Sequence, residues 1–133
     1  MTITVGVQGA IIDLGDTEAE ALDLTGGYQV ETVAGYSGGA IIKATGAGTS
    51  TATGTFVGDS GTYWLDVAWL NEHDGAAEYR VLVNGEVVGS WIGTGGEPSI
   101  TREVHRFGLD LTAGDTIALQ GIVNAGEPAR LDT

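Results

Sequence analysis

The chain has 133 residues, of which 18 are Asp or Glu and only 5 are Lys or Arg, so its formal net charge is −13. This charge repels phosphate backbones and anionic headgroups, which excludes nucleic acid and anionic membranes as favoured partners. The sequence has no Cys, which excludes disulfides, thiol nucleophiles and zinc–thiolate sites. The length suits one domain, and the acid excess suits a secreted protein or one that holds divalent cations.

Apolar and polar residues alternate with period two along most of the chain, and no helical stripe free of Gly stands out. The sequence therefore predicts an all-β protein, a sandwich or barrel in which turn signals separate short strands. No stretch approaches the ~20 apolar residues of a membrane span, and the N-terminus lacks the basic start of a signal peptide. The expected strands cover residues 2–7, 10–14, 18–24, 28–32, 40–44, 51–57, 62–71, 77–83, 86–92, 100–109, 116–123 and 129–132.

The clearest local prediction is a hairpin over residues 79–88. Asn84-Gly85 supplies the two positive-φ residues that a type I′ turn needs between alternating strands. The segment 44–54, by contrast, is small and polar throughout. Its Thr content is typical of an exposed edge strand or a loop.

The long strand expected over residues 62–71 has two distinct faces, because successive side chains point to opposite sides. The face that we assign to the core carries Tyr63, Leu65, Val67 and Trp69. Trp64 lies on the other face, where it either packs under a loop or stacks against the apolar face of a sugar ring.

Catalytic motifs are weak in this chain. Residues 35–39 match the nucleophile-elbow pattern around Ser37, but that elbow needs a strand-to-helix turn in a larger domain. His73 and His105 stand far apart and outside any metal-binding motif, which disfavours zinc. A β-domain of this length rarely builds the deep cleft of a glycoside hydrolase, so we expect no enzyme activity.

Glu18 and Glu20 form the best candidate for a metal site. Their i, i+2 spacing on an expected strand would project both carboxylates from one face. Hard oxygen ligands in that arrangement suit calcium, which binds six to eight oxygens in a flexible geometry. The alternative is an acidic strand face in solvent.

The order of several landmarks resembles the carbohydrate-binding modules of families six and thirty-five over about residues 16–133. The landmarks include Glu18-Ala19-Glu20-Ala21-Leu22, Tyr36-Ser37-Gly38-Gly39-Ala40, Gly61-Thr62-Tyr63-Trp64-Leu65-Asp66-Val67, Val83-Asn84-Gly85 and Leu131-Asp132. No single motif is specific, and their order and spacing together carry the resemblance. It implies a β-sandwich jelly roll of two antiparallel sheets, without catalytic activity, that holds a secreted bacterial enzyme on its polysaccharide.

The same resemblance implies a structural calcium between the first and last strands of the module. By position, Glu18, Glu20 and Asp132 would be its side-chain ligands, with main-chain carbonyls near residues 36–39 completing the shell. An ion there would join the two ends of the module and neutralise mutually repelling carboxylates.

The resemblance also implies a sugar cleft among the loops at one end of the sandwich, where Tyr36 and Trp91 would stack on a sugar ring. Glu97 stands where many relatives carry another aromatic residue, so a neighbouring loop is an alternative source of ligand contacts, directly or through a second calcium. Those alternative contacts are Glu72, His73 and Asp74. The opposing interpretation places both aromatic residues in the core and makes the acidic loop a solvated turn.

Arg130 and the first 15 residues leave further alternatives open. Arg130 either pairs with Glu127 or another carboxylate, or binds a uronate ligand. Residues 1–15 form an extra β segment that pairs along a sheet edge, belongs to a preceding domain or supports self-association. The function expected for residues 16–133 is non-catalytic binding of a polysaccharide or oligosaccharide. The second hypothesis is a structural or adhesive calcium-dependent sandwich without a sugar cleft.

Overall fold

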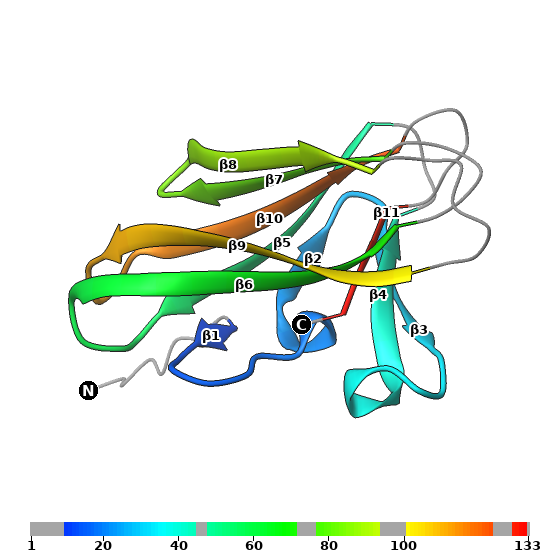
Figure 1. Cartoon of the computed structure of the whole chain (residues 1–133), viewed down its shortest axis with the longest axis horizontal. Helices are drawn as coiled ribbons and strands as arrows, with labels where there is room; N and C mark the ends of the chain where they lie inside the picture. Colours follow the sequence, from blue (N-terminus) through cyan, green and yellow to red (C-terminus); the bar gives the residue numbers. More distant parts are fainter. Residues whose placement is uncertain (1–9, 45–47, 72–76, 94–100, 124–128, 133) are drawn as a thin grey trace, which may run out of the picture.

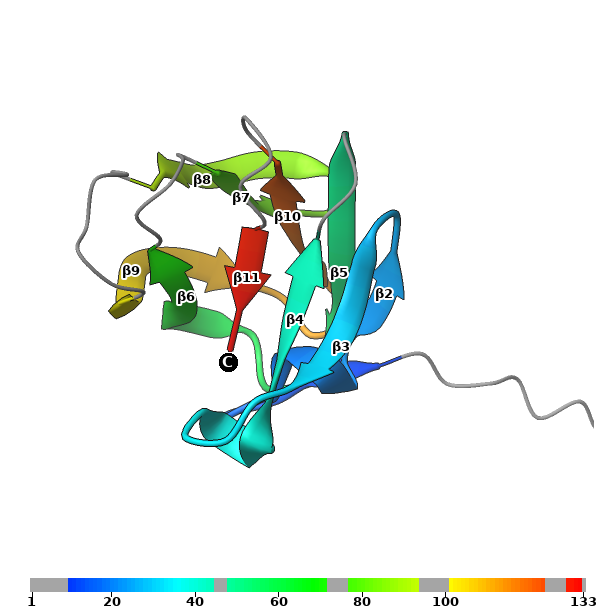
Figure 2. The same cartoon turned by 90° about the vertical axis from the view of Figure 1, so that its right-hand side faces the viewer.

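The computed structural model describes residues 10–44, 48–71, 77–93, 101–123 and 129–132. Its strands form two sheets that face each other as the layers of a sandwich (Figures 1 and 2), which confirms the predicted fold class. The first sheet contains β1 (Ile11–Ile12), β2 (Asp23–Thr25), β5 (Thr49–Phe56), β7 (Glu78–Val83), β8 (Glu86–Ile92) and β10 (Thr116–Ile122). The second contains β3 (Tyr28–Thr32), β4 (Ala40–Ala44), β6 (Gly61–Asn71), β9 (Thr101–Leu111) and β11 (Ala129–Leu131).

The first sheet has the order β1-β5-β10-β7-β8, with β2 also on β5, and the second has the order β3-β4-β11-β6-β9. All described pairings are antiparallel except that of β1 with β5. Two short 3-10 turns, η1 (Ala19–Ala21) and η2 (Ser37–Gly39), lie outside the sheets. Among the described residues, neither turn is long or apolar enough to cross a membrane.

Alternating side chains from both sheets fill the space between the layers. Val67 on β6 is 1% exposed and Trp69 is 7% exposed, and they lie on the face that the alternation assigned to the core. Ile42, Val81 and Ile117 complete the same cluster from three other strands. The predicted inward face of the long strand is therefore confirmed.

The Asn84-Gly85 hairpin is also confirmed. Asn84 has φ 51° and Gly85 has φ 83°, and the two residues connect β7 to β8. Asn84 also bonds the neighbouring turn, because its Nδ2 donates to Asp115 Oδ1 at 3.0 Å and its Oδ1 accepts from the Thr116 backbone N–H at 2.9 Å. The local turn chemistry and a tertiary contact thus favour the same geometry.

The prediction of an exposed edge strand or loop for residues 44–54 is wrong for β5. This strand lies inside its sheet, between β10 on one side and β1 and β2 on the other. Its small residues have a packing reason: a Cβ on Gly54 would lie 2.7 Å from Ile12 Cγ1 and 3.1 Å from Leu22 Cδ2. Close packing of neighbours on this strand therefore requires small side chains.

Only part of the expected N-terminal β segment, residues 1–15, lies within the described chain. Residues 2–7, expected as a strand, lie outside the described residues. Ile11–Ile12 forms β1, shorter than expected, and joins the first sheet beside Thr55. The domain boundary at residue 15 stays a prediction.

Candidate functional site

The segment of Glu18 and Glu20 is not the strand that was expected. It forms the 3-10 turn η1, with Glu18 in extended conformation at its start. Ala19 is 1% exposed, and its backbone N–H donates to the Asp132 carbonyl oxygen at 3.1 Å. This long-range bond turns the chain inward at the point where local alternation favours an extended strand.

The two glutamates nevertheless face a common point, the glycine Gly38 of η2. A Cβ on Gly38 would lie 2.9 Å from Glu20 Oε1 and 3.5 Å from Glu18 Oε2. Gly38 also has φ 63°, a conformation that L side chains rarely adopt. The backbone conformation therefore favours glycine here, and a Cβ at this position would displace the Glu20 carboxylate.

Ser37 joins these glutamates to the end of the chain. Its Oγ donates to Glu18 Oε1 at 2.6 Å, and its backbone N–H donates to Asp132 Oδ1 at 3.1 Å. We call Glu18, Glu20, Ser37 and Asp132 the acidic cluster. The serine is thus part of a carboxylate network.

Asp132 is 0% exposed and receives a third contact, from Arg102 on β9. The Arg102 Nε donates to Asp132 Oδ2 at 2.7 Å. Both oxygens of this carboxylate are therefore satisfied by the protein, and Asp132 meets the glutamates through Ser37. The Asp132 carboxylate is fully buried, whereas the Arg102 side chain is 42% exposed. Loss of the contacts to a buried carboxylate is expected to destabilise the protein.

Each of the two glutamates, unlike Asp132, has a carboxylate oxygen without a hydrogen-bond partner among the described residues. Glu18 Oε2 and Glu20 Oε2 are buried and have no hydrogen-bond partner among the described residues. Buried charge without a partner is costly, and a hard cation with oxygen ligands would supply the missing counter-charge. Over the described ranges, however, no three His, Cys, Asp or Glu side chains form a group that could hold a metal ion. The structure thus brings two of the three expected ligands to a common point and links the third through Ser37.

Tyr36, at the start of η2, lies near Arg130 of β11. Tyr36 is half-buried at the start of η2, and Arg130 pairs in register with Lys43. Burial lowers the pKa of the Arg130 guanidinium, while Glu31 and Tyr36 act in the opposite direction. A neighbouring carboxylate, Glu31, is therefore close to Arg130, whereas Glu127 lies outside the described residues.

Trp91 occupies a different environment, between the two sheets. Its ring stacks on Tyr79 of its own sheet, with centroids 5.5 Å apart, and on His105 of the facing sheet, at 4.4 Å. Both pairs have an interplanar angle of 12°. No described contact joins Trp91 to Tyr36. The geometry favours the interpretation in which Trp91 packs internally, and its role in stacking on sugar stays a prediction.

The remaining expected contacts, Glu72, His73 and Asp74, lie outside the described residues. Sequence reasoning missed Arg102, and it expected residues 36–39 to contribute main-chain carbonyls rather than the Ser37 side chain and its backbone N–H. The Gly38-Gly39 pair was a visible turn signal, but nothing local indicates that Arg102 reaches a carboxylate 30 positions away.

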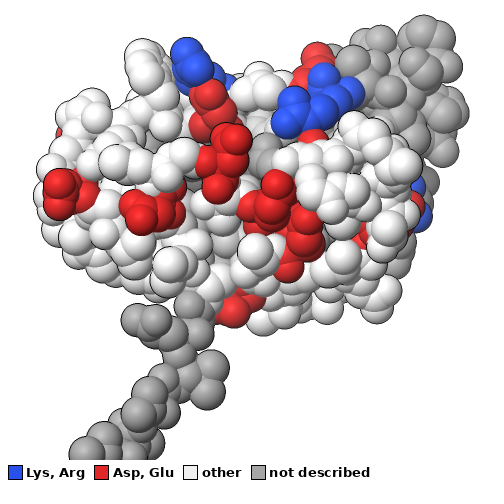
Figure 3. Space-filling view, turned by 90° about the horizontal axis from the view of Figure 1, so that it is seen from below, with Lys and Arg blue, Asp and Glu red and all other residues white. Residues whose placement is uncertain are grey.

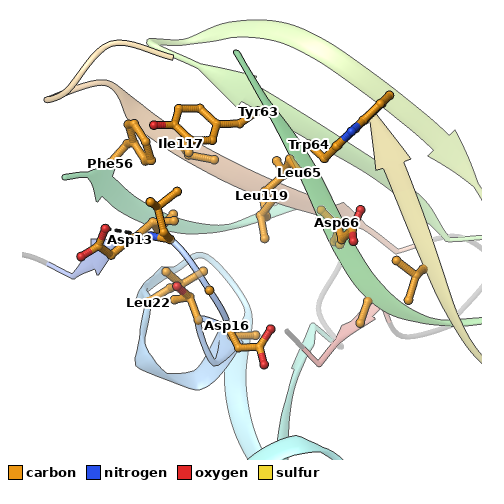
Figure 4. A pocket seen from close by; sticks show the side chains of 18 of the residues that line it. Asp13, Asp16, Leu22, Phe56, Tyr63, Trp64, Leu65, Asp66, Ile117 and Leu119 are labelled. Atoms are coloured by element: carbon orange, nitrogen blue, oxygen red, sulfur yellow. Dashed lines mark hydrogen bonds between the residues drawn. The ribbon is translucent and has the colours of Figure 1, made fainter. Parts of the chain in front are cut away.

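A cavity of about 380 Å³ adjoins the acidic cluster and is lined in part by Ala19 and Arg102. Figure 4 shows Asp13 and Asp16 on the segment after β1, across the cavity from Asp66. Its apolar wall includes Ile12, Leu22, Phe56, Leu65, Val67 and Leu119. The face of the molecule seen from below carries several acidic groups and few basic ones (Figure 3). Acidic side chains and Arg102 thus line a largely apolar hollow.

Solved structures that share this fold include carbohydrate-binding modules. A family 35 carbohydrate-binding module from Clostridium thermocellum superposes with a TM-score of 0.65 and 20% identity, over 86% of this chain and 90% of that one. The chain has the fold of a family 35 carbohydrate-binding module. A second family 35 module, from Paenibacillus barcinonensis, matches with a TM-score of 0.58 and 21% identity, over 87% and 92% of the two chains. The resemblance stated from the sequence is thereby confirmed for the fold.

Sequence comparison leads to larger proteins. The chain is 33% identical over 130 residues to the probable alpha-glucuronidase A of Aspergillus oryzae, a match that covers 86% of this chain and 15% of that protein. The chain therefore spans about 15% of the length of the curated relatives it matches. These relatives are fungal, so the bacterial origin stays a prediction. No protein-family model matches the chain.

Proposed function

We propose that this family 35-like module is non-catalytic and binds polysaccharide, keeping a secreted carbohydrate-active enzyme on its substrate. The observation that carries the proposal is the match over 90% of a free-standing family 35 module, beside a match over only 15% of an alpha-glucuronidase. A segment of that size is a module of those enzymes rather than their whole catalytic machinery. Tethering raises the local concentration of the enzyme on the polymer without any new contact.

The names of the sequence relatives suggest a substrate that bears glucuronosyl groups. Arg130 fits such a ligand, because a guanidinium binds carboxylates with two parallel hydrogen bonds. Tyr36 beside it would supply an apolar ring for the sugar. Glu72, His73, Asp74 and Trp91 remain proposed ligand contacts on the strength of the family resemblance.

Affinity electrophoresis in gels that contain glucuronoxylan tests this function, with galactan and galactomannan gels as comparisons. Retardation of the module by glucuronoxylan is the expected result, and Arg130→Gln should reduce it. A glutamine keeps similar length but cannot form the charged bidentate contact. No retardation in any of the three gels would contradict the proposal.

We also propose a structural calcium held by Glu18 and Glu20, with Asp132 as third carboxylate. The support is the pair of buried glutamate oxygens that lack partners and face one glycine. Calcium would neutralise this charge and add its binding free energy to that of folding. The ion would have no part in a reaction.

The Glu20→Gln variant tests the calcium site, because its effect on stability should be unfavourable in calcium and neutral or favourable in chelator. In calcium at 100 times its Kd, the wild type should gain about 2.7 kcal/mol of stability over chelator, and the variant should gain clearly less. In chelator, the variant should unfold at the same or a higher temperature, because one repelling carboxylate is gone. Calorimetric melting measures both arms, with Glu86→Gln as a matched exposed control. Equal calcium responses in all three proteins would refute the site.

The second candidate function is a structural or adhesive calcium-dependent sandwich. The stacking of Trp91 on Tyr79 and His105 favours it, because an internally packed ring is not available to a sugar. Calcium dependence of melting without retardation in any polysaccharide gel would support this alternative.

A further inference from the structure

The outer face of β6 and β9 carries a large exposed aromatic ring. Trp64 is 71% exposed, whereas the neighbouring Val67 and Trp69 of the same strand are buried. An indole packed under a loop would not retain this exposure, so that alternative fails. An exposed indole offers a large apolar ring face that a ligand ring can cover.

The ring is held in place by its neighbours on β9. Gly108 lies opposite Trp64 in the ladder, and a Cβ on it would lie 3.6 Å from the indole Cζ3. The Arg106 guanidinium lies 5.6 Å from the ring centroid. The indole therefore lies beside Gly108 of β9, and the Arg106 guanidinium over its face restrains it. A restrained ring loses less entropy when a ligand binds to it.

Arg106 is itself fixed by Asp66. Its Nε donates to Asp66 Oδ1 at 2.7 Å and its Nη2 donates to Asp66 Oδ2 at 2.9 Å. This bidentate pair cancels both charges beside the ring. We call Trp64, Asp66 and Arg106 the Trp64 face.

The chemistry of the Trp64 face fits a pyranose ring. The indole offers an apolar surface to the C–H groups of a sugar. A guanidinium has five N–H donors, so those not directed at Asp66 can reach hydroxyl groups. Because the face is locally neutral, it neither requires nor repels a charged ligand.

The surface beside the ring has room for more than one sugar. Trp64 and Asp66 also line the cavity of about 380 Å³, with Asp13 and Asp16 on its far side (Figure 4). Carboxylates there would accept hydrogen bonds from sugar hydroxyls. A polymer stacked on Trp64 can therefore continue over a polar rim.

We propose that the Trp64 face is a second carbohydrate-binding surface, which stacks one pyranose of a polysaccharide chain and consists of residues other than Tyr36 and Arg130. The inference rests on the proposed function, since it assumes that the module binds carbohydrate. Two contacts on one polymer act through effective concentration. The Trp64 face therefore contributes more to polymer binding than to binding of a short oligosaccharide.

Affinity electrophoresis of the whole chain in glucuronoxylan, galactan and galactomannan gels tests the inference with Trp64→Ala and Trp64→Phe. The alanine variant should bind the retarding polymer about tenfold more weakly, and the phenylalanine variant should retain part of the affinity. Val87→Ala, which removes exposed apolar surface from the other sheet, is the matched control. Thermal melting should show all four proteins equally folded.

Tryptophan fluorescence gives an independent readout. The retarding polysaccharide should protect the wild type from acrylamide quenching, and Trp64→Phe should lose that protection. If a polysaccharide retards the wild type and retards Trp64→Ala equally, this inference is overturned and the proposed function still stands. No wild-type retardation in any gel would instead overturn the proposed function.

Discussion

The acidic cluster and the Trp64 face use carboxylates in opposite ways. In the acidic cluster, Asp132 is fully buried and paired, while Glu18 and Glu20 each bury an oxygen without a hydrogen-bond partner in the described part of the chain. At the Trp64 face, Asp66 is exposed and its charge is already matched by Arg106. Burial makes unmatched charge costly, whereas exposure leaves it solvated. The first region therefore suits a cation, and the second suits an uncharged ligand.

Asp132→Asn should produce the largest effect, because it removes a charge that Arg102 and Ser37 both contact. We expect the free energy of unfolding to fall by about 3 kcal/mol, measured by urea denaturation. The control is Asp110→Asn, which changes an exposed carboxylate that accepts a bond from Thr62. Similar losses in the two variants would break the contrast between buried and exposed carboxylates.

Gly38→Ala should have an intermediate effect with two separable parts. The positive φ should cost about 1–3 kcal/mol, and the added Cβ would also crowd Glu20 Oε1 at 2.9 Å. Gly39→Ala is a matched control, since Gly39 has φ 72° and nothing within 4 Å of its Cβ position. Melting with calcium and with chelator should show a reduced calcium response for Gly38→Ala alone. A normal response would separate Gly38 from the calcium site.

Arg106→Gln should have the smallest effect on stability and a clear effect on titration. The side-chain hydrogen bond from Arg106 lowers the pKa of Asp66, so the variant should raise it towards the ordinary value of about 3.9. A lowered folded-state pKa contributes stability above the unfolded-state pKa and loses it as pH falls through the folded value. The contribution of the Asp66–Arg106 pair to the free energy of unfolding should therefore be constant between about pH 5 and 8, and it should decrease at lower pH.

NMR titration of the Asp66 carboxyl measures this shift. Asp115 is an internal control, because the Thr112 backbone N–H and the Asn84 amide lower its pKa without Arg106. A shift at Asp115 in the variant would show that the fold itself had changed, and the comparison at Asp66 would then fail.

Local patterns predicted the parts of the fold that depend on neighbouring residues. Alternation identified the inward face of β6, and Asn84-Gly85 identified its hairpin. The same reasoning failed for Glu18 and Glu20, because the bond from Ala19 to Asp132 overrides the local pattern. It also failed for β5, since the sequence of a strand does not show whether other strands flank it on both sides.

Only part of the candidate site could be predicted, because several of its contacts join residues that lie far apart in the sequence. The resemblance identified Glu18, Glu20 and Asp132, and two of them converge on Gly38. It could not show that Arg102 holds Asp132. For Trp91 the resemblance implied stacking on a sugar, with packing in the core as the alternative, and the sequence could not show that His105 of the facing sheet stacks on its ring. Trp64 was placed on the correct face, but only the structure shows that nothing described covers it.

The bond from Ala19 to Asp132 has a mechanical consequence. A pulling force applied to the chain before Glu18 and after Asp132 reaches this point before it reaches the ladder of β6 and β9. The Ser37 contacts to Glu18 and Asp132 bear the same load. The contacts of the acidic cluster would thus have to break before the sandwich unfolds under tension. Because forced unfolding is governed by the unfolding rate, these contacts would limit how long the folded module survives a pulling force.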